Sequence, residues 1–334
     1  MTSPARRVTM RDLARAVGVS SMTVSRALRG DATVSDETRQ KVEAAARDLG
    51  YVYDLTAQAF RTKKSGFVAV TLPSLNSANF AETYGALSAG TDMQLLLGAT
   101  NYDMAQEEEA VRQLLTRNPE ALILTGGHHT DTTRELVTGR GVPVIEIWDL
   151  PSQPLGHCVG FSNADAMGGL VAHLAHAGRW RIGFIGASEG RDFRGAERRK
   201  GAEAAAKALG LPPITFLDAG PAPISMRHSA ALLDEMGAAR VAEFDALIGV
   251  ADPVAFGALS ACQRMGLRVP DDIAIAGFGN FEIASVCAPR ITTVDVHSGK
   301  IGEETARLLG DLLEGDLPPQ RIDVGARVVV GETG

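Results

Sequence analysis

Apolar residues between positions 9 and 49 recur at helical spacing and predict three short helices. In the first, apolar side chains fall on one face at i, i+3, i+4 and i+7, namely Met10, Leu13, Ala14 and Val17. Thr9 precedes this run, and Asp12 follows it three places later, which is the spacing of a capping box. Gly18 then ends the helix, because glycine adopts the left-handed turn without steric cost.

Two further helices follow, each opened by a serine that can cap it. Ser20 begins the second helix, whose predicted inward positions are Val24, Ala27 and Leu28. Ser35 begins the third helix, with acidic residues in its first turn and with Val42, Ala45, Ala46 and Leu49 as its predicted buried positions. The glycine turn between the first two helices is typical of a helix-turn-helix.

The second helix carries an outward polar and basic face, made of Ser21, Met22, Ser25, Arg26 and Arg29. Such a helix fits the major groove of DNA, and short side chains near its start allow a close approach. Arg26 is long enough for a bidentate contact to guanine, worth about 1–3 kcal/mol of discrimination. The alternative is a three-helix bundle without any role in nucleic-acid binding.

From residue 65 the pattern changes to short apolar runs separated by helical segments. The runs that predict buried parallel strands are 67–72, 94–99, 121–126, 143–147, 181–187, 214–218, 245–250 and 272–278. Alternating strands and helices predict an α/β fold with two doubly wound lobes. Ligands bind outside the carboxyl ends of such strands, so two facing lobes predict a cleft that can close.

Charge separates the two parts of the chain. Residues 1–64 hold 12 Lys and Arg against 7 Asp and Glu, whereas the remaining residues carry a net charge of −12. A basic head on an acidic body suggests that the head meets a polyanion, although a solubilising tail has the same composition. The 3 cysteines show no metal spacing, and no apolar run is long enough to span a bilayer. We therefore expect a cytoplasmic protein without a membrane partner.

The sequences VTMRDLARAVGVSSMTVSRALRG and VSDETRQKVEAAARDLGYVYD resemble the DNA-binding head of the LacI/GalR repressor family. The similarity is in register over about fifty residues, which is far more specific than a general helix-turn-helix pattern. It implies that residues 1–50 form the DNA-binding domain. It places base-reading positions at Ser21, Met22 and Arg26, and phosphate contacts at Thr9, Ser20, Thr23, Ser25 and Arg29.

Residues 51–64 connect the head to the body and are too short to form a stable isolated helix. The resemblance implies a hinge helix that folds on DNA and inserts a leucine into the minor groove. Here the matching residue is Phe60, which can also act as an intercalating wedge. Phe60 packing against the body is the alternative, because phenylalanine is usually buried.

The body, residues 65–334, resembles the periplasmic-binding-protein-like effector domain of the same family. Stretches such as TLPSLNSANFAETYGAL, GFSNADAMGG and the final ARVVVGETG are similar to the gluconate-utilisation repressor branch. The resemblance implies a first lobe over about 65–160 and a second over about 161–290, with the C-terminal segment crossing back. It also implies a sugar-acid effector, such as gluconate or a phosphorylated sugar acid, and no cofactor.

Candidate effector contacts follow from strand ends and from this resemblance. Strand ends place Leu75, Ser77, Asn79 and Phe80 at the mouth of the first lobe, and Trp148 and Phe161 at positions for an aromatic platform or for ordinary packing. Arg198 matches the family's effector-anchoring arginine, and a guanidinium holds an acid bidentately. A solvated arginine in a basic cluster is its alternative. Asp252 could accept a hydroxyl hydrogen bond or cap the following helix. Asn163 and Asn280 complete the set.

Three positions depart from the family pattern by lacking an amide or carboxylate side chain that the family has there. Ala251 stands in place of an asparagine, whereas Gly279 and Ser162 each stand in place of an aspartate. Losing carboxylates from a cleft that keeps Arg198 makes its potential more positive, in agreement with an anionic effector.

Catalytic and metal-binding motifs are weak or missing in the sequence. There is no phosphate-binding GxxxxGK[ST] loop, no GxSxG and no HExxH, and GFGNFE lacks the third glycine of a dinucleotide fingerprint. His173 and His176 lie at i, i+3 on an expected helix, but without a third ligand a structural role is favoured. His128 and His129 are expected in a solvated loop, with a place in the cleft as the alternative. We expect neither an enzyme nor a metal site.

The hypothesis that unites these features is a homodimeric transcriptional repressor. It would bind a near-palindromic operator in double-stranded DNA and be released by a small sugar acid. One alternative replaces the inducer with a corepressor or a phosphoprotein partner. Another is a sugar-acid sensor that does not bind DNA.

Overall fold

The computed structural model describes residues 8–52, 65–188, 191–315 and 317–334. Contacts divide the chain into two compact units, Met1–Ser65 and Gly66–Gly334. Each unit is a separate body with its own apolar core.

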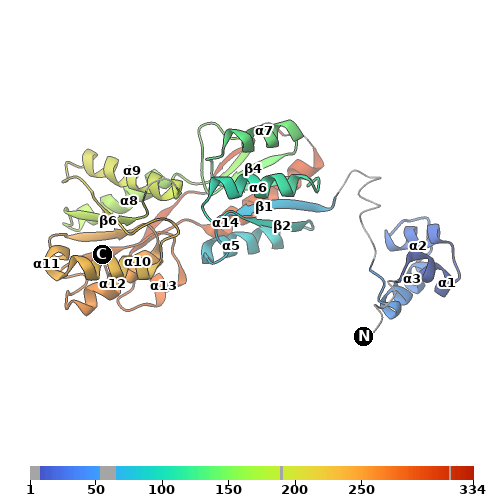
Figure 1. Cartoon of the computed structure of the whole chain (residues 1–334), viewed down its shortest axis with the longest axis horizontal. Coiled ribbons are helices and arrows are strands. Elements are labelled where there is room, and N and C mark those ends of the chain that lie inside the picture. The colour runs from blue at the N-terminus through green and yellow to red at the C-terminus, as the bar shows by residue number, and fades with distance from the viewer. Residues whose placement is uncertain (1–7, 53–64, 189–190, 316) are drawn as a thin grey trace. The chain divides into compact units, whose positions relative to one another are not determined.

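The first unit contains α1 (Met10–Val17), α2 (Ser21–Leu28) and α3 (Asp36–Leu49) (Figure 1). The predicted helix starts are confirmed, because Thr9, Ser20 and Ser35 are the three N-caps. Gly18 ends α1 at φ 75°, in the left-handed region that favours glycine. The core of this unit is Leu13, Ala14, Val24, Ala27, Val34, Val42 and Ala46. The prediction for Leu49 is wrong: its side chain is 41% exposed at the last turn of α3.

The first lobe of the body is built on a parallel six-stranded sheet in the order β11-β5-β4-β3-β1-β2. Its strands are β1 (Phe67–Leu72), β2 (Gln94–Ala99), β3 (Leu122–Thr125), β4 (Val144–Ile147), β5 (His157–Gly160) and β11 (Arg321–Asp323). Helices α6 (Met104–Leu115) and α7 (Asp131–Arg140) cover one face, and α5 (Ala78–Ala89) and α14 (Ser298–Glu314) cover the other. Alternate residues of β1 therefore enter different cores: Ala69 faces α6, and Val68 and Val70 face α5.

The second lobe has a parallel four-stranded sheet in the order β7-β6-β8-β9. Its strands are β6 (Ile182–Gly186), β7 (Thr215–Asp218), β8 (Ala246–Gly249) and β9 (Ala274–Ala276). Two helix pairs pack on it, α8 (Asn163–His176) with α9 (Phe193–Ala208), and α10 (Met226–Met236) with α12 (Asp252–Arg264). The short helices α11 (Ala238–Val241) and α13 (Glu282–Val286) and the antiparallel pair β10 (Thr293–Asp295) and β12 (Arg327–Val329) complete it.

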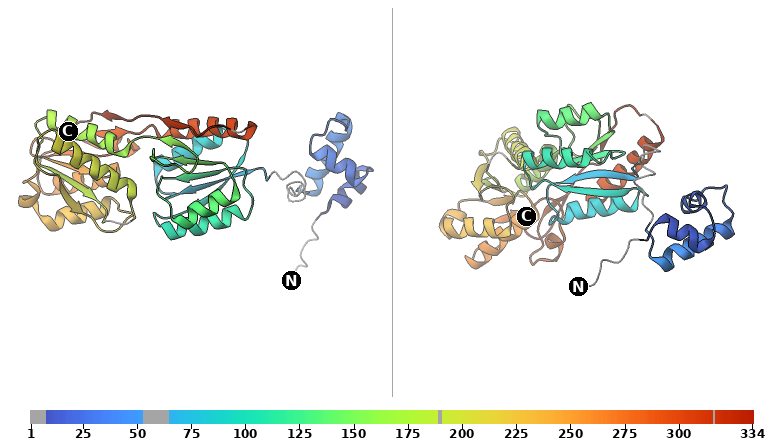
Figure 2. Two further views of the ribbon diagram at one scale, coloured as in Figure 1. Left: turned by 90° about the horizontal axis from the view of Figure 1, so that it is seen from above. Right: turned by 45° about the vertical axis from the view of Figure 1, so that its right-hand side comes forward.

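The chain passes between the lobes near residues 161–162, 296–297 and 324–326, as Figure 2 shows from above. All eight strands expected from the sequence are present, so the doubly wound α/β prediction is confirmed. Strands β5, β10, β11 and β12 were not anticipated. Strand β10 packs in the second lobe and extends it beyond residue 290.

Candidate functional site

The outward face of α2 is free of internal polar bonds at its basic end. The Arg26 side chain is exposed and, among the described residues, makes no hydrogen bond or ion pair. Met22 is 60% exposed, while Ser21 and Ser25 are half-buried. Arg29 is the C-cap of α2. The helix thus presents a face suited to reading the major groove.

The predicted phosphate contacts include hydroxyls that already cap helices. Thr9 Oγ1 donates to Asp12 Oδ2 at 2.6 Å, and Asp12 N donates back to Thr9 Oγ1 at 3.3 Å. Thr23 N donates to Ser20 Oγ at 3.1 Å. These bonds fix the two helix N-termini, whose remaining N–H groups can meet phosphate. Phe60 lies outside the described residues.

A cavity of the body lies between the lobes, with an empty volume of about 670 Å³ including its open mouth. Ligand pockets for small molecules span about 300–1,000 Å³. The first lobe supplies Ser77, Asn79, Phe80, Tyr102 and Trp148. The second lobe and its crossing segments supply Asp192, Arg194, Arg198, Ala222, Pro223, Ile224, Val250, Ala251, Val254, Phe278, Gly279, Phe281 and Val296. The cavity therefore combines aromatic walls with two guanidinium groups.

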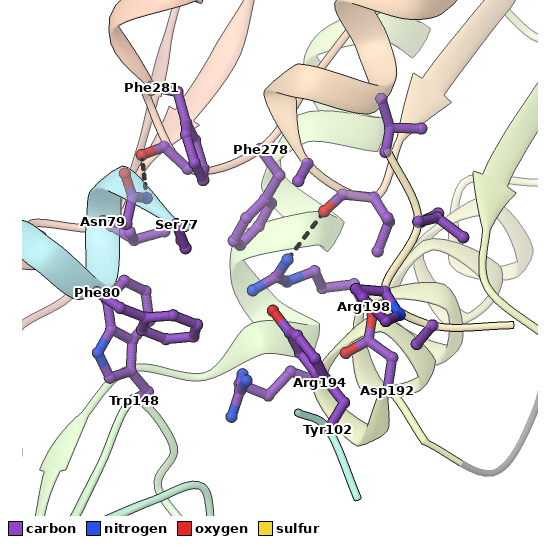
Figure 3. A pocket seen from close by; sticks show the side chains of 18 residues that line it. Ser77, Asn79, Phe80, Tyr102, Trp148, Asp192, Arg194, Arg198, Phe278 and Phe281 are labelled. Atoms are coloured by element: carbon purple, nitrogen blue, oxygen red, sulfur yellow. Dashed lines mark hydrogen bonds between the residues drawn. The ribbon is translucent and has the colours of Figure 1, made fainter. Parts of the chain in front are cut away.

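Arg198 enters the cavity from the second turn of α9 (Figure 3). Its Nε donates to Asn163 Oδ1 at 2.8 Å, and its Nη1 donates to the Val250 carbonyl at 2.8 Å. The guanidinium carbon lies 4.0 Å from the centre of the Phe278 ring, a cation–π contact. Burial lowers the pKa of Arg198 to about 10, with Asp192 opposing the shift and Arg194 adding to it. The guanidinium group therefore stays protonated at neutral pH. The alternative, a solvated arginine in a basic cluster, is wrong, because Arg198 lines the cavity.

Asn163 does not line this cavity but positions Arg198. Its Nδ2 donates to Asp149 Oδ1 at 2.7 Å, while its Oδ1 accepts from Arg198. Asp149 Oδ2 in turn accepts from Gly127 N at 3.2 Å. This chain of hydrogen bonds joins α9 of the second lobe to the ends of β3 and β4 in the first.

Several residues that the sequence did not single out face the cavity. Arg194 lies one turn before Arg198 on α9, and Tyr102 comes from the loop after β2. Burial raises the pKa of Tyr102, and the charge of Arg194 opposes that shift. The i, i+4 spacing of the two arginines was the available signal, because such pairs share a helix face.

The predicted first-lobe contacts are only partly brought together. Ser77, Asn79, Phe80 and Trp148 line the cavity, and Phe80 meets Trp148 edge-on with ring centres 5.0 Å apart. Asn79 Nδ2 is already used, since it donates to the Gly279 carbonyl at 2.7 Å.

The remaining predicted contacts lie elsewhere. Leu75 is 62% exposed in the loop after β1, outside the cavity. Phe161 is buried between Trp148 and Phe278 rather than lining the cavity, so its alternative as a packing residue holds. Asn280 is exposed and does not line the cavity, and its backbone is in the left-handed conformation at φ 52°.

Neither role expected for Asp252, a ligand contact or a helix cap, agrees with the structure. It is fully buried and does not line the cavity, and the N-cap of α12 is Ala251. Its Oδ1 accepts from Thr293 Oγ1 at 2.6 Å, and its Oδ2 accepts from Phe281 N at 2.7 Å. Burial raises the pKa of Asp252 to about 6, against these hydrogen bonds. Asp252 therefore holds the cavity-lining segment 278–281 in place.

Two of the positions that depart from the family pattern lie in the cavity wall. Ala251 and Gly279 both line it, whereas Ser162 is the N-cap of α8 and lies outside it. A Cβ on Gly279 would come within 2.8 Å of Asn79 Nδ2 and would also meet the Phe281 ring, at a backbone φ of 114°. The segment can therefore carry only glycine here without rearrangement.

The histidines differ in their surroundings. The solvated loop expected for His129 is wrong, because its side chain is buried between Glu107 and Glu146. His128 stacks on Phe193 of α9, with ring centres 4.7 Å apart. His173 approaches the backbone carbonyl of Gly334, and His176 approaches that of Ala172.

Within the described ranges, no group of three or more His, Cys, Asp and Glu is arranged to hold a metal ion. No helix in those ranges is long and apolar enough to cross a membrane.

Comparison with known proteins accounts for both units. Residues 9–54 match the model of bacterial regulatory proteins of the lacI family, and residues 171–333 match a periplasmic binding protein-like domain. The HTH-type transcriptional regulator GntR of Pseudomonas aeruginosa is 34% identical, covering 98% of this chain and 96% of the relative.

Solved structures agree with this relationship. A LacI family transcriptional regulator from Silicibacter pomeroyi is 30% identical with a TM-score of 0.90, covering 98% of this chain and 99% of the other. A lac repressor dimer bound to operator and the anti-inducer ONPF has the same fold, with 24% identity and a TM-score of 0.83, covering 98% and 99% of the two chains. These relatives are transcriptional regulators rather than enzymes, and the chain belongs to the LacI family of DNA-binding transcriptional regulators.

Proposed function

We propose that this regulator is a homodimeric repressor that a small sugar acid, such as gluconate or a phosphorylated sugar acid, releases from a near-palindromic operator. It acts in the cytoplasm, where the operator lies. The observation that carries the effector class is the pair of guanidinium groups in an aromatic cavity between two lobes. A carboxylate or phosphate is the natural partner of such groups.

The DNA side of the proposal is supported by the exposed face of α2. Among the described residues the Arg26 side chain makes no hydrogen bond or ion pair, and Met22, one helical turn before it, is exposed, so both are available to base edges. A dimer follows from the two-fold symmetry that a palindromic site mirrors, and the related lac repressor has been solved as a dimer bound to operator. A sensor without DNA binding is not retained, given the match of residues 9–54 to the lacI family.

The effector side is supported by which side chains the cavity lacks. Ala251 and Gly279 leave its wall without two polar groups, while Arg194 and Arg198 supply positive charge. Phe80, Trp148 and Phe278 provide apolar faces for the carbon chain of a sugar. Neutral sugars would offer the guanidinium groups only hydroxyl oxygens, whose hydrogen bonds are weaker than charge-assisted bonds to an acid.

The test begins with operator selection by the full-length protein from a random duplex library. Binding of the selected duplex is then measured by fluorescence anisotropy at fixed salt, with added D-gluconate, 6-phosphogluconate or the neutral D-glucitol. We expect the acids to weaken operator binding and glucitol to have no effect. Tighter binding with the acids would identify a corepressor and contradict the proposed release.

Arg26→Ala is compared in the same assay with Lys41→Ala, which removes an equal charge from the exposed side of α3. Loss of a bidentate base contact should cost about 1–3 kcal/mol at one base position and relax its selection. Equal weakening of all duplexes by Arg26→Ala would make Arg26 a phosphate contact instead. No sequence preference in the wild type would contradict operator recognition itself.

A further inference from the structure

Arg194 reaches from the second lobe into aromatic side chains of the first. Its side chain is 8% exposed, and its guanidinium carbon lies 5.4 Å from the Phe80 ring centre and 6.0 Å from that of Tyr102. Arg194 stands on α9, whereas Phe80 is on α5 and Tyr102 follows β2. Figure 3 shows Arg194 and Arg198 entering the same space opposite Phe80 and Trp148.

The two arginines differ in how far the protein already uses them. Arg198 donates from Nε to Asn163 Oδ1 and from Nη1 to the Val250 carbonyl, and one face of its guanidinium covers the Phe278 ring. This leaves one N–H of Nη1 and both N–H groups of Nη2 for a ligand. Arg198 is therefore a rigidly held donor, with two of its five N–H groups already used by the protein.

Arg194 has most of its donors free. Among the described residues it forms no ion pair, and its one polar partner is the Tyr102 side chain. Gly126, at φ 102°, leaves room for the Arg194 side chain, because a Cβ at position 126 would lie 3.3 Å from Arg194 Nη1. A planar guanidinium with free donors in a buried aromatic setting is suited to bidentate recognition of an acid.

The nearby carboxylates do not neutralise Arg194 by direct pairing. Asp149 accepts hydrogen bonds from Asn163 and Gly127, and Asp192 Oδ1 caps α9 by accepting from Gly195 N at 3.0 Å. Neither lies within ion-pair distance of Arg194 among the described residues. The two carboxylates moderate the charge of the site but leave the donors of Arg194 unpaired.

We propose that Arg194 is the specificity-determining residue for an acidic effector, binding a carboxylate or phosphate group placed between it and Arg198. The inference rests on the proposed function and adds which residue separates an acid from a neutral sugar. Arg198 orients the ligand, and Arg194 supplies the charge-assisted hydrogen bonds that a neutral hydroxyl cannot match. Because its aromatic neighbours belong to the other lobe, Arg194 meets the ligand in the closed cleft.

The experiment measures calorimetric binding of D-gluconate and D-glucitol to the full-length protein. These ligands share an open six-carbon chain and differ at the acid. Arg194→Gln is compared with wild type and with Lys200→Gln, which removes the same charge from the solvent side of α9. Arg194→Met, which keeps the aliphatic contact with Phe80 but has no charge, provides a second variant if the glutamine variant does not fold.

We expect Arg194→Gln to lose about 10- to 100-fold in gluconate affinity, the range for a hydrogen bond to a charged group. Glucitol affinity should change less than threefold, and Lys200→Gln should bind both ligands as the wild type does. A gluconate-to-glucitol affinity ratio that survives in both Arg194 variants would overturn this role while leaving the acidic effector in place. A wild type without preference for the acid would overturn the role and the proposed function together.

Discussion

At the residue scale, His129 holds two buried carboxylates together in the first lobe. Its Nδ1 lies 2.6 Å from Glu107 Oε1, and its Nε2 lies 3.3 Å from Glu146 Oε1. Burial by itself would lower the pKa of His129, but the hydrogen bond to Glu107 and the close approach of both carboxylates outweigh it and raise the pKa to about 9. A protonated His129 therefore links α6 to β4.

This raised pKa makes the stability of the body depend on pH. The unfolded value is 6.5, so the stabilisation is complete below that pH and is lost as pH rises through about 9. His129→Gln should remove that slope and, by leaving two buried carboxylates without a cation, cost about 3 kcal/mol or more at pH 7. Thermal unfolding midpoints between pH 6 and pH 10 measure both effects.

His173→Gln is the control, because His173 is half-buried and, within the described ranges, its side chain has one hydrogen-bond partner, a carbonyl 3.4 Å away. It should keep the wild-type pH slope. A wild-type midpoint that stays level, or rises, between pH 6.5 and pH 9 would show that His129 is neutral in the folded protein.

At the scale of elements, glycines allow the helix pairs around the cavity to pack closely. On α14, a Cβ at Gly302 would collide with the Thr83 carbonyl of α5. On α9, a Cβ at Gly201 would collide with the Ala164 backbone of α8. These contacts set the positions of α5 and α9, the helices that carry Phe80 and both cavity arginines. Close packing of this kind tolerates little added volume.

The same helix supplies a matched pair of substitutions. Gly302→Ala should destabilise the body by about 1–3 kcal/mol through overpacking. Gly310→Ala should stabilise it by about 0.5–1 kcal/mol, because Gly310 is exposed on α14 with open space around its Cβ position and alanine favours the helix. Urea unfolding of both variants measures the difference. Equal effects at the two positions would mean that α5 and α14 are not in close contact.

At the scale of the whole molecule, the proposed function requires coupling between the head and the cavity. If a sugar acid weakens operator binding by some factor, the operator must weaken acid binding by the same factor. Asn163, Asp149 and Gly127 already connect Arg198 to the first lobe through hydrogen bonds, so a ligand on Arg198 acts on both lobes.

We therefore expect gluconate to bind about 5- to 150-fold more weakly to the protein on its selected operator than to the free protein. Calorimetric titration of gluconate with and without the operator duplex measures this factor at one salt concentration. A random duplex of equal length is the control. Identical gluconate affinity with and without operator would remove the coupling.

The sequence alone determined the local features of this protein. Capping residues Thr9, Ser20 and Ser35 fixed the helix starts of the head, since a cap acts within one turn. Apolar runs marked eight of the strands, because strands buried on both faces carry little polar interruption. The family pattern located Arg198 in the cavity wall.

Only the tertiary structure decided which distant residues meet. Asp252 was expected at the ligand, but Thr293 and the backbone of Phe281 occupy its carboxylate, and both come from later segments. His129 looked like a loop residue until α6 and β4 brought Glu107 and Glu146 around it. Arg194 gained its importance from Phe80 and Tyr102, more than ninety residues earlier in the chain. Local pattern carries propensity, whereas burial and partner choice depend on contacts between elements that only folding brings together.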